Sequence, residues 1–335
     1  MKAVILSGAN KPVHIEDIPT PTPAANEILI KLAYSAFNYR DVWIRTGNYN
    51  SAVKDRIVLG SDGFGTIAAL GHDVTGWEIG QPVIINPSHN WGDNPAAFDP
   101  SFKILGSPDQ GTFAEYIAVG QQYVHAKPDG YTDEEAAALP LAGITTYRAV
   151  TTRAQVRKGE KVLITGIGAG TALLALHFAL VAGAEVYVTS SSPEKIAKAQ
   201  TLGAKDGFNY RNADWVDKAT ASSGGFDVIL DSASGDGFAS LLQLAKPGGR
   251  IVFWGATSGI INNIRPADIF YKNLSVLGTT MGTPQEFKDM LQLIKDHPSI
   301  KPIVDKVYPS LDHAEEALQY MKAGQQFGKI VLTNQ

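Results

Sequence analysis

The chain has 335 residues, of which 44% are hydrophobic, 19% are charged and none is cysteine, and its formal net charge is −4. The absence of cysteine excludes disulfide frameworks, cysteine-ligated zinc, iron–sulfur clusters and thiol nucleophiles. The acidic balance argues against a nucleic-acid-binding protein, since such proteins usually carry a basic face. No apolar run reaches the ~18 residues of a membrane span, and the N-terminal stretch is too interrupted for a signal peptide. We therefore expect a soluble cytoplasmic protein with roughly two domains.

Residues 1–125 predict a β-rich unit. Short runs rich in β-branched residues alternate there with Pro, Gly, Asp and Asn turns, which is typical of an all-β, barrel-like unit. The expected strands are Ala3–Leu6, Val13–Ile15, Glu27–Ala33, Ile57–Leu59, Gly65–Ala69, Pro82–Ile85 and Phe113–Val119.

Residues 86–110 consist of turn-forming residues with isolated aromatic side chains, among them His89 and Trp91. A stretch of this length without regular structure is usually functional or mobile. We expect an ordinary ordered loop, and a direct role in lining a substrate site is the alternative.

The pattern changes after Lys127. Thr132 and Glu135 have the spacing of a capping box and open an Ala-rich helix over Asp133–Leu139. From Val150 onward, helices alternate with apolar strands, which predicts a doubly wound parallel sheet of the α/β class. The strands expected there are Lys161–Thr165, Glu185–Thr189, Phe226–Asp231 and Arg250–Trp254, and the helices are Thr171–Ala182, Pro193–Leu202 and Phe238–Leu244. Helices Pro284–Asp296 and Leu311–Lys322 and a strand within Gln326–Thr333 complete the chain.

A glycine-rich turn follows the first strand of this alternation and precedes a helix. Glycines allow a tight turn and let a pyrophosphate approach the backbone, while the helix N-terminus supplies N–H groups and a positive dipole end. The residues expected to bind a dinucleotide here are Gly166, Gly168, Ala169, Gly170 and Thr171. The strict motif would have glycine in place of Thr171, although the small Ala172 next to it still permits close packing on the sheet. A glycine turn without a ligand is the alternative.

The next strand, Glu185–Thr189, ends in hydroxyl residues and carries no acid at the position that binds the 2′-hydroxyl of NAD. Ser190, Ser191, Lys195 and Tyr210 instead suit a 2′-phosphate, since Lys195 supplies a positive charge and hydroxyls donate to phosphate oxygens. We therefore expect NADP(H) in preference to NAD(H). Lys195 alone could be a solvated helix residue, so the inference rests on the four residues together.

Several segments, taken in their order along the chain, resemble motifs of the medium-chain dehydrogenase/reductase superfamily. Asn38–Gly47 resembles its N-x-x-D-x-x-x-R-x-G segment, Gly60–Gly65 its G-x-[DE]-x-x-G turn, and Glu134–Tyr147 its E-A-A-A-L-P…T-A-Y segment. The glycine loop, Lys195, Leu202–Ala204, Asn209–Tyr210 and Phe327–Leu332 follow. The likeness covers nearly the whole chain, and the branch it resembles most is the quinone oxidoreductase group, which lacks zinc.

The resemblance implies a GroES-like β-rich catalytic domain interrupted by a Rossmann domain. The implied boundaries are 1–125 for the GroES-like domain, completed by 266–335, and 126–265 for the NADP(H)-binding domain. The active site would lie in the cleft between the two. The family's dimers imply a homodimer, with the apolar residues of 260–280 extending the sheet across a two-fold axis.

Zinc-dependent members of the family bind their catalytic metal through Cys, then His or an acid, then Cys. This chain has Asn38 at the first position and Ser61 beside Asp62 at the second, and the third falls near Leu141. Only Asp62 is a suitable ligand, whereas catalytic zinc usually takes three from the protein. Residues 86–110 also lack the four cysteines of the family's structural zinc. We therefore expect no metal.

Without a Lewis acid, the expected reaction is hydride transfer to a small electrophile whose developing charge can delocalise, namely a quinone or an α,β-unsaturated carbonyl. Asn38 is expected to donate to the developing oxyanion or to hold the nicotinamide ribose. For Asp41 we favour a role in orienting the nearby backbone and Arg45 over that of a base.

The other residues at this implied site have two interpretations each. Tyr39 and Trp43 either line the substrate pocket or pack in the core, and either Tyr39 or solvent supplies the proton. Ser61 and Asp62 shape a turn and could face the substrate.

The resemblance also assigns residues to the cofactor by motif position. Thr145 and Gly255 would lie along it, Ser232 would lie near the adenosine, and Phe327 and Lys329 would approach it from the returning C-terminal segment. Two other functions remain open, a zinc-free carbonyl or alcohol oxidoreductase and a non-catalytic NADPH-binding protein.

Overall fold

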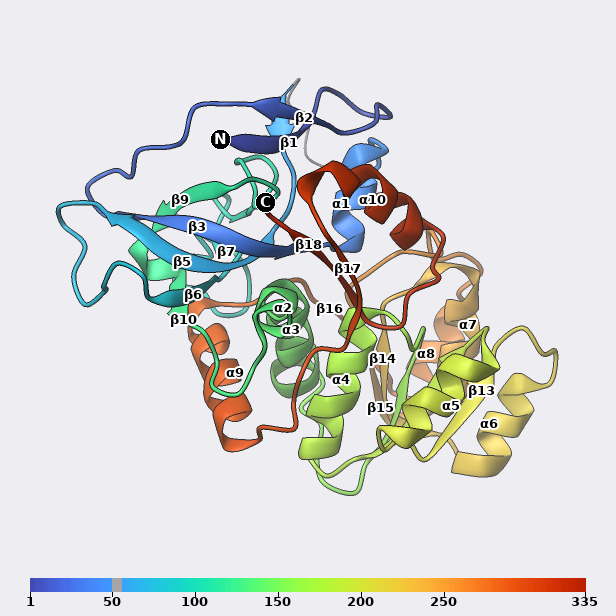
Figure 1. Ribbon diagram of the computed structural model, residues 1–335. Coiled ribbons are helices and arrows are strands. Elements are labelled where there is room, and N and C mark those ends of the chain that lie inside the picture. The colour runs from blue at the N-terminus through green and yellow to red at the C-terminus, as the bar shows by residue number, and fades with distance from the viewer. Residues whose placement is uncertain (50–55) are drawn as a thin grey trace. The chain divides into compact units, whose positions relative to one another are not determined.

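The computed structural model describes residues 1–49 and 56–335, and the chain leaves one unit, forms a second and then returns to the first (Figure 1). Unit 1 consists of Met1–Ala142 and Gly282–Gln335, and unit 2 of Gly143–Met281. The expected insertion of one unit into the other is therefore present. The sequence placed the joins at 125/126 and 265/266, whereas the structure places them later, at 142/143 and 281/282.

Packing and strand pairing explain the later joins. Helix α2 (Asp133–Ala138) packs on strands β3 (Glu27–Ala36) and β5 (Asp62–Leu70) of unit 1. Near the other join, strand β16 (Ser275–Gly278) pairs in parallel with β15 (Ala245–Phe253) and so belongs to unit 2. Helix α2 and strand β16 thus each have packing partners that local sequence patterns do not show.

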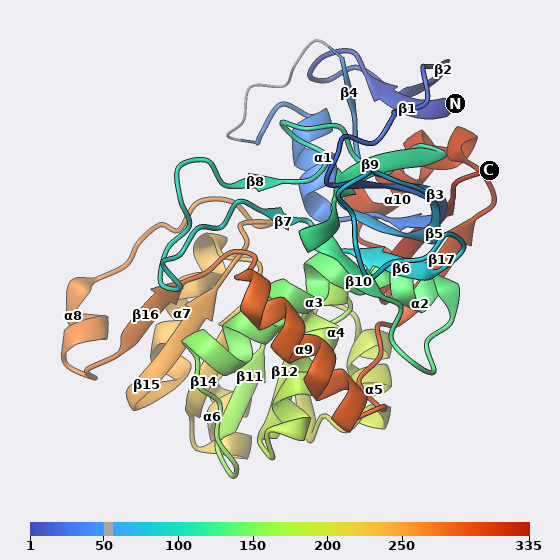
Figure 2. The ribbon, with the colours of Figure 1, turned by 90° about the vertical axis from the view of Figure 1, so that its left-hand side faces the viewer.

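Unit 1 is mostly antiparallel sheet (Figures 1 and 2). A small sheet has the order β2-β1-β4, and a larger one runs β10-β6-β5-β3-β18-β17, with β9 also paired to β3. Its remaining strands are β1 (Lys2–Leu6), β2 (His14–Asp17), β4 (Ile57–Val58), β6 (Pro82–Ile85), β7 (Ser88–His89), β8 (Lys103–Ile104), β9 (Tyr116–Gly120), β10 (Val124–Ala126), β17 (Val304–Tyr308) and β18 (Lys329–Thr333). Its helices besides α2 are α1 (Tyr39–Arg45), α9 (Pro284–Asp296) and α10 (Ala314–Lys322), and α3 (Pro140–Tyr147) crosses the join.

Strand β3 shows why these residues form a half-buried sheet. Ile28, Ile30 and Leu32 alternate with more exposed residues and pack into a core with Ile117 and Val119 of β9. Such a period of two is what a strand with one buried face requires. A second core lies between the small sheet and α10.

Residues 86–110 fold around an aromatic cluster. The ring of Trp91 lies edge-on to Phe98 and Phe102, with centroids 5.9 and 5.4 Å away, and the two phenylalanine rings stack at 4.7 Å. Trp91 is only 2% exposed, and its indole N–H donates to the Asn94 carbonyl at 3.0 Å. This segment is therefore an ordered loop with a small core of its own.

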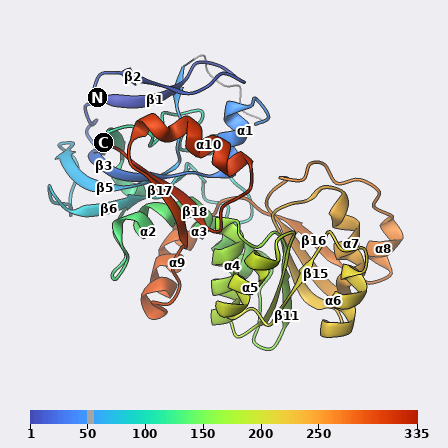
Figure 3. The same cartoon turned by 45° about the vertical axis from the view of Figure 1, so that its right-hand side comes forward.

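Unit 2 is a six-stranded, all-parallel sheet with the order β13-β12-β11-β14-β15-β16 (Figure 3). Its other strands are β11 (Lys161–Ile164), β12 (Glu185–Ser190), β13 (Asp206–Asn209) and β14 (Phe226–Asp231). Its helices are α4 (Gly170–Val181), α5 (Pro193–Thr201), α6 (Trp215–Ser223), α7 (Phe238–Leu244) and α8 (Pro266–Phe270), and Arg148–Arg153 forms a π-helix.

Helices cover both faces of this sheet. Leu163, Tyr187 and Ile229 point to one face, where they pack with residues of α6 and α7. Neighbouring positions along the strands face the other way, and Val188 lies there close to Ile196 of α5. Because both faces are buried, the strands are continuously apolar, as the sequence pattern predicted. In the part of the chain that the structure describes, no helix combines the length and apolar character needed to cross a membrane.

Candidate functional site

Three polar side chains of unit 1 form a buried network at one end of β5 and β18. Asn38 caps the N-terminus of α1, Asp62 begins β5, and Lys329 begins β18. The Lys329 ammonium donates to Asn38 Oδ1 at 2.6 Å, to Asp62 Oδ2 at 3.0 Å and to the Phe37 carbonyl at 2.8 Å. Asn38 Nδ2 donates to Asp62 Oδ2 at 2.9 Å, and Asp62 Oδ1 accepts from the Leu141 backbone N–H at 2.7 Å.

This network fixes the orientation of the Asn38 amide. Lys329 can only donate and an ionised Asp62 can only accept, so the amide oxygen must face the ammonium and the amide nitrogen the carboxylate. One N–H of Nδ2 remains for another acceptor, and Asn38 is 7% exposed. Lys329 donates all three of its ammonium hydrogens to acceptors inside unit 1, and its cofactor contact stays a prediction.

Asp41, at the third position of α1, is fully buried. Its Oδ2 accepts from the Asn38 backbone N–H at 2.8 Å, which confirms that it orients nearby backbone. Oδ1 has no hydrogen-bond partner among the described residues. Burial raises the pKa of Asp41 to about 6, and the charge of Arg40 and the Asn38 N–H offset this only in part. The expected pairing with Arg45 is wrong, because Arg45 Nε donates to Glu315 Oε2 at 3.1 Å instead.

Asp41→Asn is expected to change how stability depends on pH. Because the pKa of Asp41 is raised in the folded state, its protonated form favours folding, and wild-type stability falls as pH rises from about 4 through 6. The asparagine cannot titrate. The free energy of unfolding of the variant should therefore rise by up to ~3 kcal/mol relative to that of wild type over this pH interval, in addition to any pH-independent effect of the substitution. Urea unfolding of both proteins at pH 4.5 and 7.5 measures this. An equal difference at the two pH values would contradict the assignment.

Ser61 is fully buried and is held by Arg40, a residue that the sequence analysis did not single out. The Arg40 Nη1 donates to Ser61 Oγ at 2.6 Å and to the Leu105 carbonyl at 2.9 Å. Ser61 Oγ in turn donates to the Leu105 carbonyl at 2.7 Å. The pair therefore ties the turn before β5 to the end of the 86–110 loop. The only sequence signal for this pair was the presence of Arg40 within the Asn38–Gly47 segment.

Tyr39 and Trp43 lie one helical turn apart on α1, with an edge-on ring contact at 5.3 Å. Both are half-buried, and Tyr39 packs against the core beneath the small sheet. The structure thus gives Tyr39 the packing role that was one of its two interpretations. A substrate contact for either ring stays a prediction.

In unit 2 the glycine loop connects β11 to α4 as the sequence suggests. Gly166 and Gly168 have φ values of +64° and +118°, which side-chain-bearing residues rarely adopt. Ala169 is the N-cap, α4 begins at Gly170, and Ala172 is fully buried on the sheet. A Cβ on Gly166 would meet nothing nearer than Ser232 Oγ at 3.8 Å, so space is open beside this glycine. The loop and helix end therefore suit the pyrophosphate of a dinucleotide.

Ser232 and Gly255 lie in the loops after β14 and β15, which approach closely. A Cβ on Gly255 would lie 2.4 Å from the Ser232 carbonyl oxygen, so only glycine fits there. Asp231, at the end of β14, accepts from Thr165 Oγ1 at 2.5 Å and from the Ser234 N–H at 2.9 Å. Sequence reasoning missed Asp231 and Thr165, although an acid ending an apolar strand was the available signal.

The residues predicted to bind a 2′-phosphate come from the ends of two paired strands and one helix. The backbone N–H of Tyr210 donates to the Ser190 carbonyl at 3.3 Å, Ser191 follows β12, and Lys195 lies in the first turn of α5. Ser190 is 5% exposed and Tyr210 is 48% exposed. The sheet thus brings these predicted residues into one region of unit 2.

Thr145 and Phe327 belong to different units. Thr145 Oγ1 contacts Met281 Sδ at 3.7 Å in unit 2. The Phe327 backbone N–H donates to Asp305 at 3.0 Å in unit 1. Their cofactor contacts stay predictions.

Comparison with known proteins gives consistent matches along the chain. The model of the alcohol dehydrogenase GroES-like domain matches residues 24–129, and that of zinc-binding dehydrogenases matches 170–296. The zinc-type alcohol dehydrogenase-like protein YogA of Leptosphaeria maculans is 34% identical, with 96% of this chain and 94% of that protein covered.

Other relatives and a solved structure point the same way. Acryloyl-coenzyme A reductase of Sulfurisphaera tokodaii is 27% identical over 99% of both chains, and human quinone oxidoreductase is 28% identical over 94% of this chain and 92% of its own. A crystal structure of an NAD-dependent alcohol dehydrogenase has a TM-score of 0.93 and 32% identity over 99% of both chains. The chain therefore belongs to the medium-chain dehydrogenase/reductase superfamily, as an oxidoreductase with a GroES-like unit and a Rossmann-type unit.

Proposed function

We propose that this protein is an NADPH-dependent reductase that delivers hydride to a quinone or an α,β-unsaturated carbonyl without zinc. The observation that carries the proposal is the chemistry of the atoms at the family's zinc positions. Asn38 Oδ1 accepts from the Lys329 ammonium at 2.6 Å, and Ser61 Oγ accepts from the Arg40 guanidinium at 2.6 Å. The third position is the apolar Leu141, which contributes a backbone N–H donor.

These residues do not fit a zinc ion. A divalent cation there would lie beside two buried positive side chains, and like charges repel strongly at such distances in a poorly solvated site. Asp62, the one carboxylate, already accepts from Lys329, Asn38 and Leu141. Within the described ranges, no group of three or more His, Cys, Asp or Glu residues could hold a metal ion.

The glycine loop and the N-terminus of α4 would hold the pyrophosphate of the dinucleotide, and Ser190, Ser191, Lys195 and Tyr210 its 2′-phosphate. When bound, NADPH supplies the hydride. The protein contributes orientation and hydrogen bonding. The Asn38 Nδ2–H left over by the buried network would donate to an oxygen that gains negative charge, and the Tyr39 hydroxyl or solvent would supply the proton.

The reaction is tested with three acceptors of similar size, a quinone, an enone and the corresponding saturated ketone, each with NADPH. We expect turnover of the first two, because hydride addition to a conjugated acceptor leaves a delocalised enolate or hydroquinone anion. Addition to a saturated ketone leaves a localised alkoxide, which forms less readily without a Lewis acid. Turnover of the saturated ketone alone would favour a carbonyl reductase. Tight NADPH binding without oxidation by any electrophile would favour a non-catalytic role.

Two variants of helix α5, Lys195→Ala and Lys198→Ala, test the preference for NADPH over NADH. Lys195 lies in the first turn and Lys198 in the last, so only the first is near the predicted phosphate site. We expect wild type to bind NADPH more tightly than NADH, and Lys195→Ala to lose about tenfold in NADPH affinity, equivalent to ~1.4 kcal/mol, with NADH unchanged. Lys198→Ala should change neither. Calorimetric titration measures the affinities of wild type and both variants for NADPH and for NADH. Equal wild-type affinities would contradict the proposal, and so would tighter binding of NADH, which the name of the NAD-dependent neighbour would suggest.

We also propose a homodimer formed through unit 2. Strand β16 is an edge strand among the described strands, and Ile260 and Tyr271, in the segment that precedes it in the chain, are 78% and 80% exposed. An open edge with exposed apolar side chains is a ready surface for sheet extension between two copies. Sedimentation velocity distinguishes a dimer mass from the monomer mass that would overturn this proposal.

A further inference from the structure

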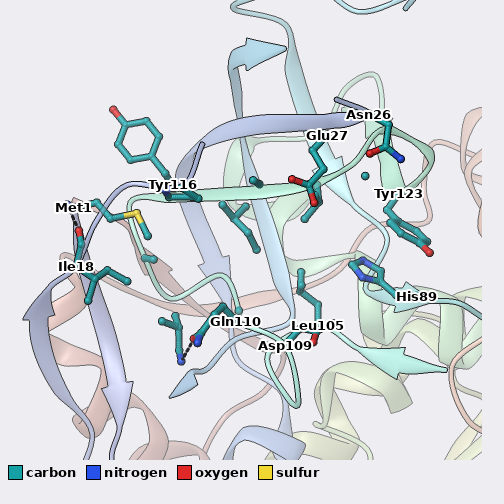
Figure 4. Close-up of a pocket in the computed structure, with 18 of the residues that line it drawn as sticks. Met1, Ile18, Asn26, Glu27, His89, Leu105, Asp109, Gln110, Tyr116 and Tyr123 are labelled. Carbon is teal, nitrogen blue, oxygen red and sulfur yellow. Dashed lines mark hydrogen bonds between the residues drawn. The ribbon is translucent and has the colours of Figure 1, made fainter. Parts of the chain in front are cut away.

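A groove in unit 1 runs beside strand β9 and belongs to no site described above. Its volume is about 520 Å³, within the range of ligand-binding pockets. Met1 and Ile18 lie at one end, His89 and Tyr123 at the other, and Leu105 and Asp109 between them (Figure 4). None of Asn38, Asp62 and Lys329 lines it.

The backbone of β9 faces this groove with an open edge. The Leu32 N–H donates to the Glu115 carbonyl and the Gln121 N–H to the Asn26 carbonyl, and the register between these two bonds is unbroken. Antiparallel pairing alternates, so Ile117 and Val119 bond to β3, whereas Tyr116, Ala118 and Gly120 direct their N–H and C=O groups to the other edge. Among the described strands, β9 pairs with β3 alone.

A neighbouring strand shows that this edge accepts a partner. Strand β1 covers the same edge just before β9, through Val4 N–H to the Phe113 carbonyl and Glu115 N–H to the Lys2 carbonyl. The hydrogen bonds from β1 end there, whereas the groove continues past them along all five residues of β9, from Tyr116 to Gly120. The five residues of β9 span ~14 Å from first to last, the length of four to five residues of extended chain.

The groove walls favour a ligand that donates hydrogen bonds and carries positive charge. Glu27 and Asp109 line it, and among the described residues no Lys or Arg side chain does. One oxygen of each acid is engaged, Glu27 Oε2 by the Ala24 N–H at 2.9 Å and Asp109 Oδ1 by Lys103 at 3.2 Å, which leaves the other oxygen of each for a ligand. The Met1 ammonium, at the far end of the groove, donates to the Ile18 carbonyl at 2.8 Å. His89 stacks on Tyr123 with ring centroids 3.8 Å apart, and its Nε2 is buried with no hydrogen-bond partner among the described residues. Burial lowers the pKa of His89 to about 4, so at neutral pH the ring is uncharged, and its bond to the Asn86 backbone leaves Nε2 as an acceptor.

We propose that this groove binds an extended peptide segment with a basic side chain, which adds a strand to the edge of β9. The peptide backbone would pair with the outward N–H and C=O groups of Tyr116, Ala118 and Gly120. Its basic side chain would lie against Glu27 and Asp109. This mode of recognition takes affinity from main-chain hydrogen bonds and specificity from the pockets for alternate side chains.

The test uses the full chain and a fluorescein-labelled hexapeptide of alternating threonine and valine with one central lysine. Fluorescence anisotropy gives its affinity. Two modified probes follow, one N-methylated at alternate backbone nitrogens and one with glutamate in place of lysine. We expect each modified probe to bind at least tenfold more weakly. Since neither changes the protein, misfolding cannot mimic the result.

A pair of variants locates the binding. Ala118→Pro removes an outward N–H and fills the edge with the proline ring, which an edge strand tolerates. Ala118→Thr keeps the N–H and serves as the control. We expect the proline variant to lose at least tenfold in affinity and the threonine variant to keep wild-type affinity, with both retaining the wild-type melting temperature and NADPH binding. Absence of probe binding, equal binding of either modified probe, or unchanged binding by Ala118→Pro would overturn the proposal.

Discussion

Replacing Lys329 with methionine is expected to lower the free energy of unfolding by ~3–5 kcal/mol, because it leaves a buried carboxylate without its cation. The side chains of Lys329 and Asp62 are 4% and 0% exposed, so water cannot replace the lost ion pair. Loss of the ammonium also frees Asn38 Oδ1, so the amide is no longer held in one orientation and kcat should fall with it. Urea unfolding measures the first effect and enone reduction the second.

Two further variants separate charge from packing. Lys329→Met combined with Asp62→Asn leaves no unpaired charge, so it should recover much of the stability lost in the single variant. Lys306→Met is the control, since it removes a lysine of β17 whose side chain is 44% exposed. Its free energy of unfolding should be close to that of wild type. If the double variant is as unstable as Lys329→Met alone, the charge explanation is wrong.

Trp91→Ala is expected to unfold the 86–110 loop locally, at a cost of ~3–5 kcal/mol, which is typical for truncation of a buried large aromatic residue. Its ring contacts both Phe98 and Phe102, and its indole N–H closes the turn at Asn94. Faster amide hydrogen exchange confined to residues 86–110 would measure this.

Phe98→Ala serves as the matched control in the same cluster. Phe98 is 48% exposed, so its truncation removes less buried surface and should have a clearly smaller effect. Equal exchange rates in both variants, or exchange that rises throughout unit 1 in Trp91→Ala, would contradict a local aromatic core.

Much of the fold could be predicted because the signals are local. The apolar strands of unit 2, the capping box at Thr132 and the glycine turn at Gly166 each lie within a few residues of what they determine. Strand β13 and helix α6 were not predicted. The sequence of β13, D-G-F-N, has weak strand propensity, and only its parallel pairing with β12 makes it a strand.

The site was harder to predict because its partners lie far apart in the chain. Asp62 and Lys329 are 267 positions apart, and Arg45 and Glu315 are 270 apart. Arg45 was expected to pair with Asp41 because the two are neighbours on one helix. In the folded protein Arg45 pairs with Glu315, which tertiary packing brings next to it. Motif position singled out Lys329 as a cofactor contact, which stays a prediction, but no local pattern reveals its buried acceptors on other elements.

The proposed reaction is tested most directly by following deuterium from NADPH doubly deuterated at C4 of the nicotinamide into an enone, with protein dialysed against a strong chelator. Mass spectrometry and NMR of the product locate the label. We predict one deuterium on the β-carbon, at a rate that added zinc does not change. A product without deuterium, or transfer that appears only when zinc is restored, would contradict zinc-independent hydride transfer by this protein.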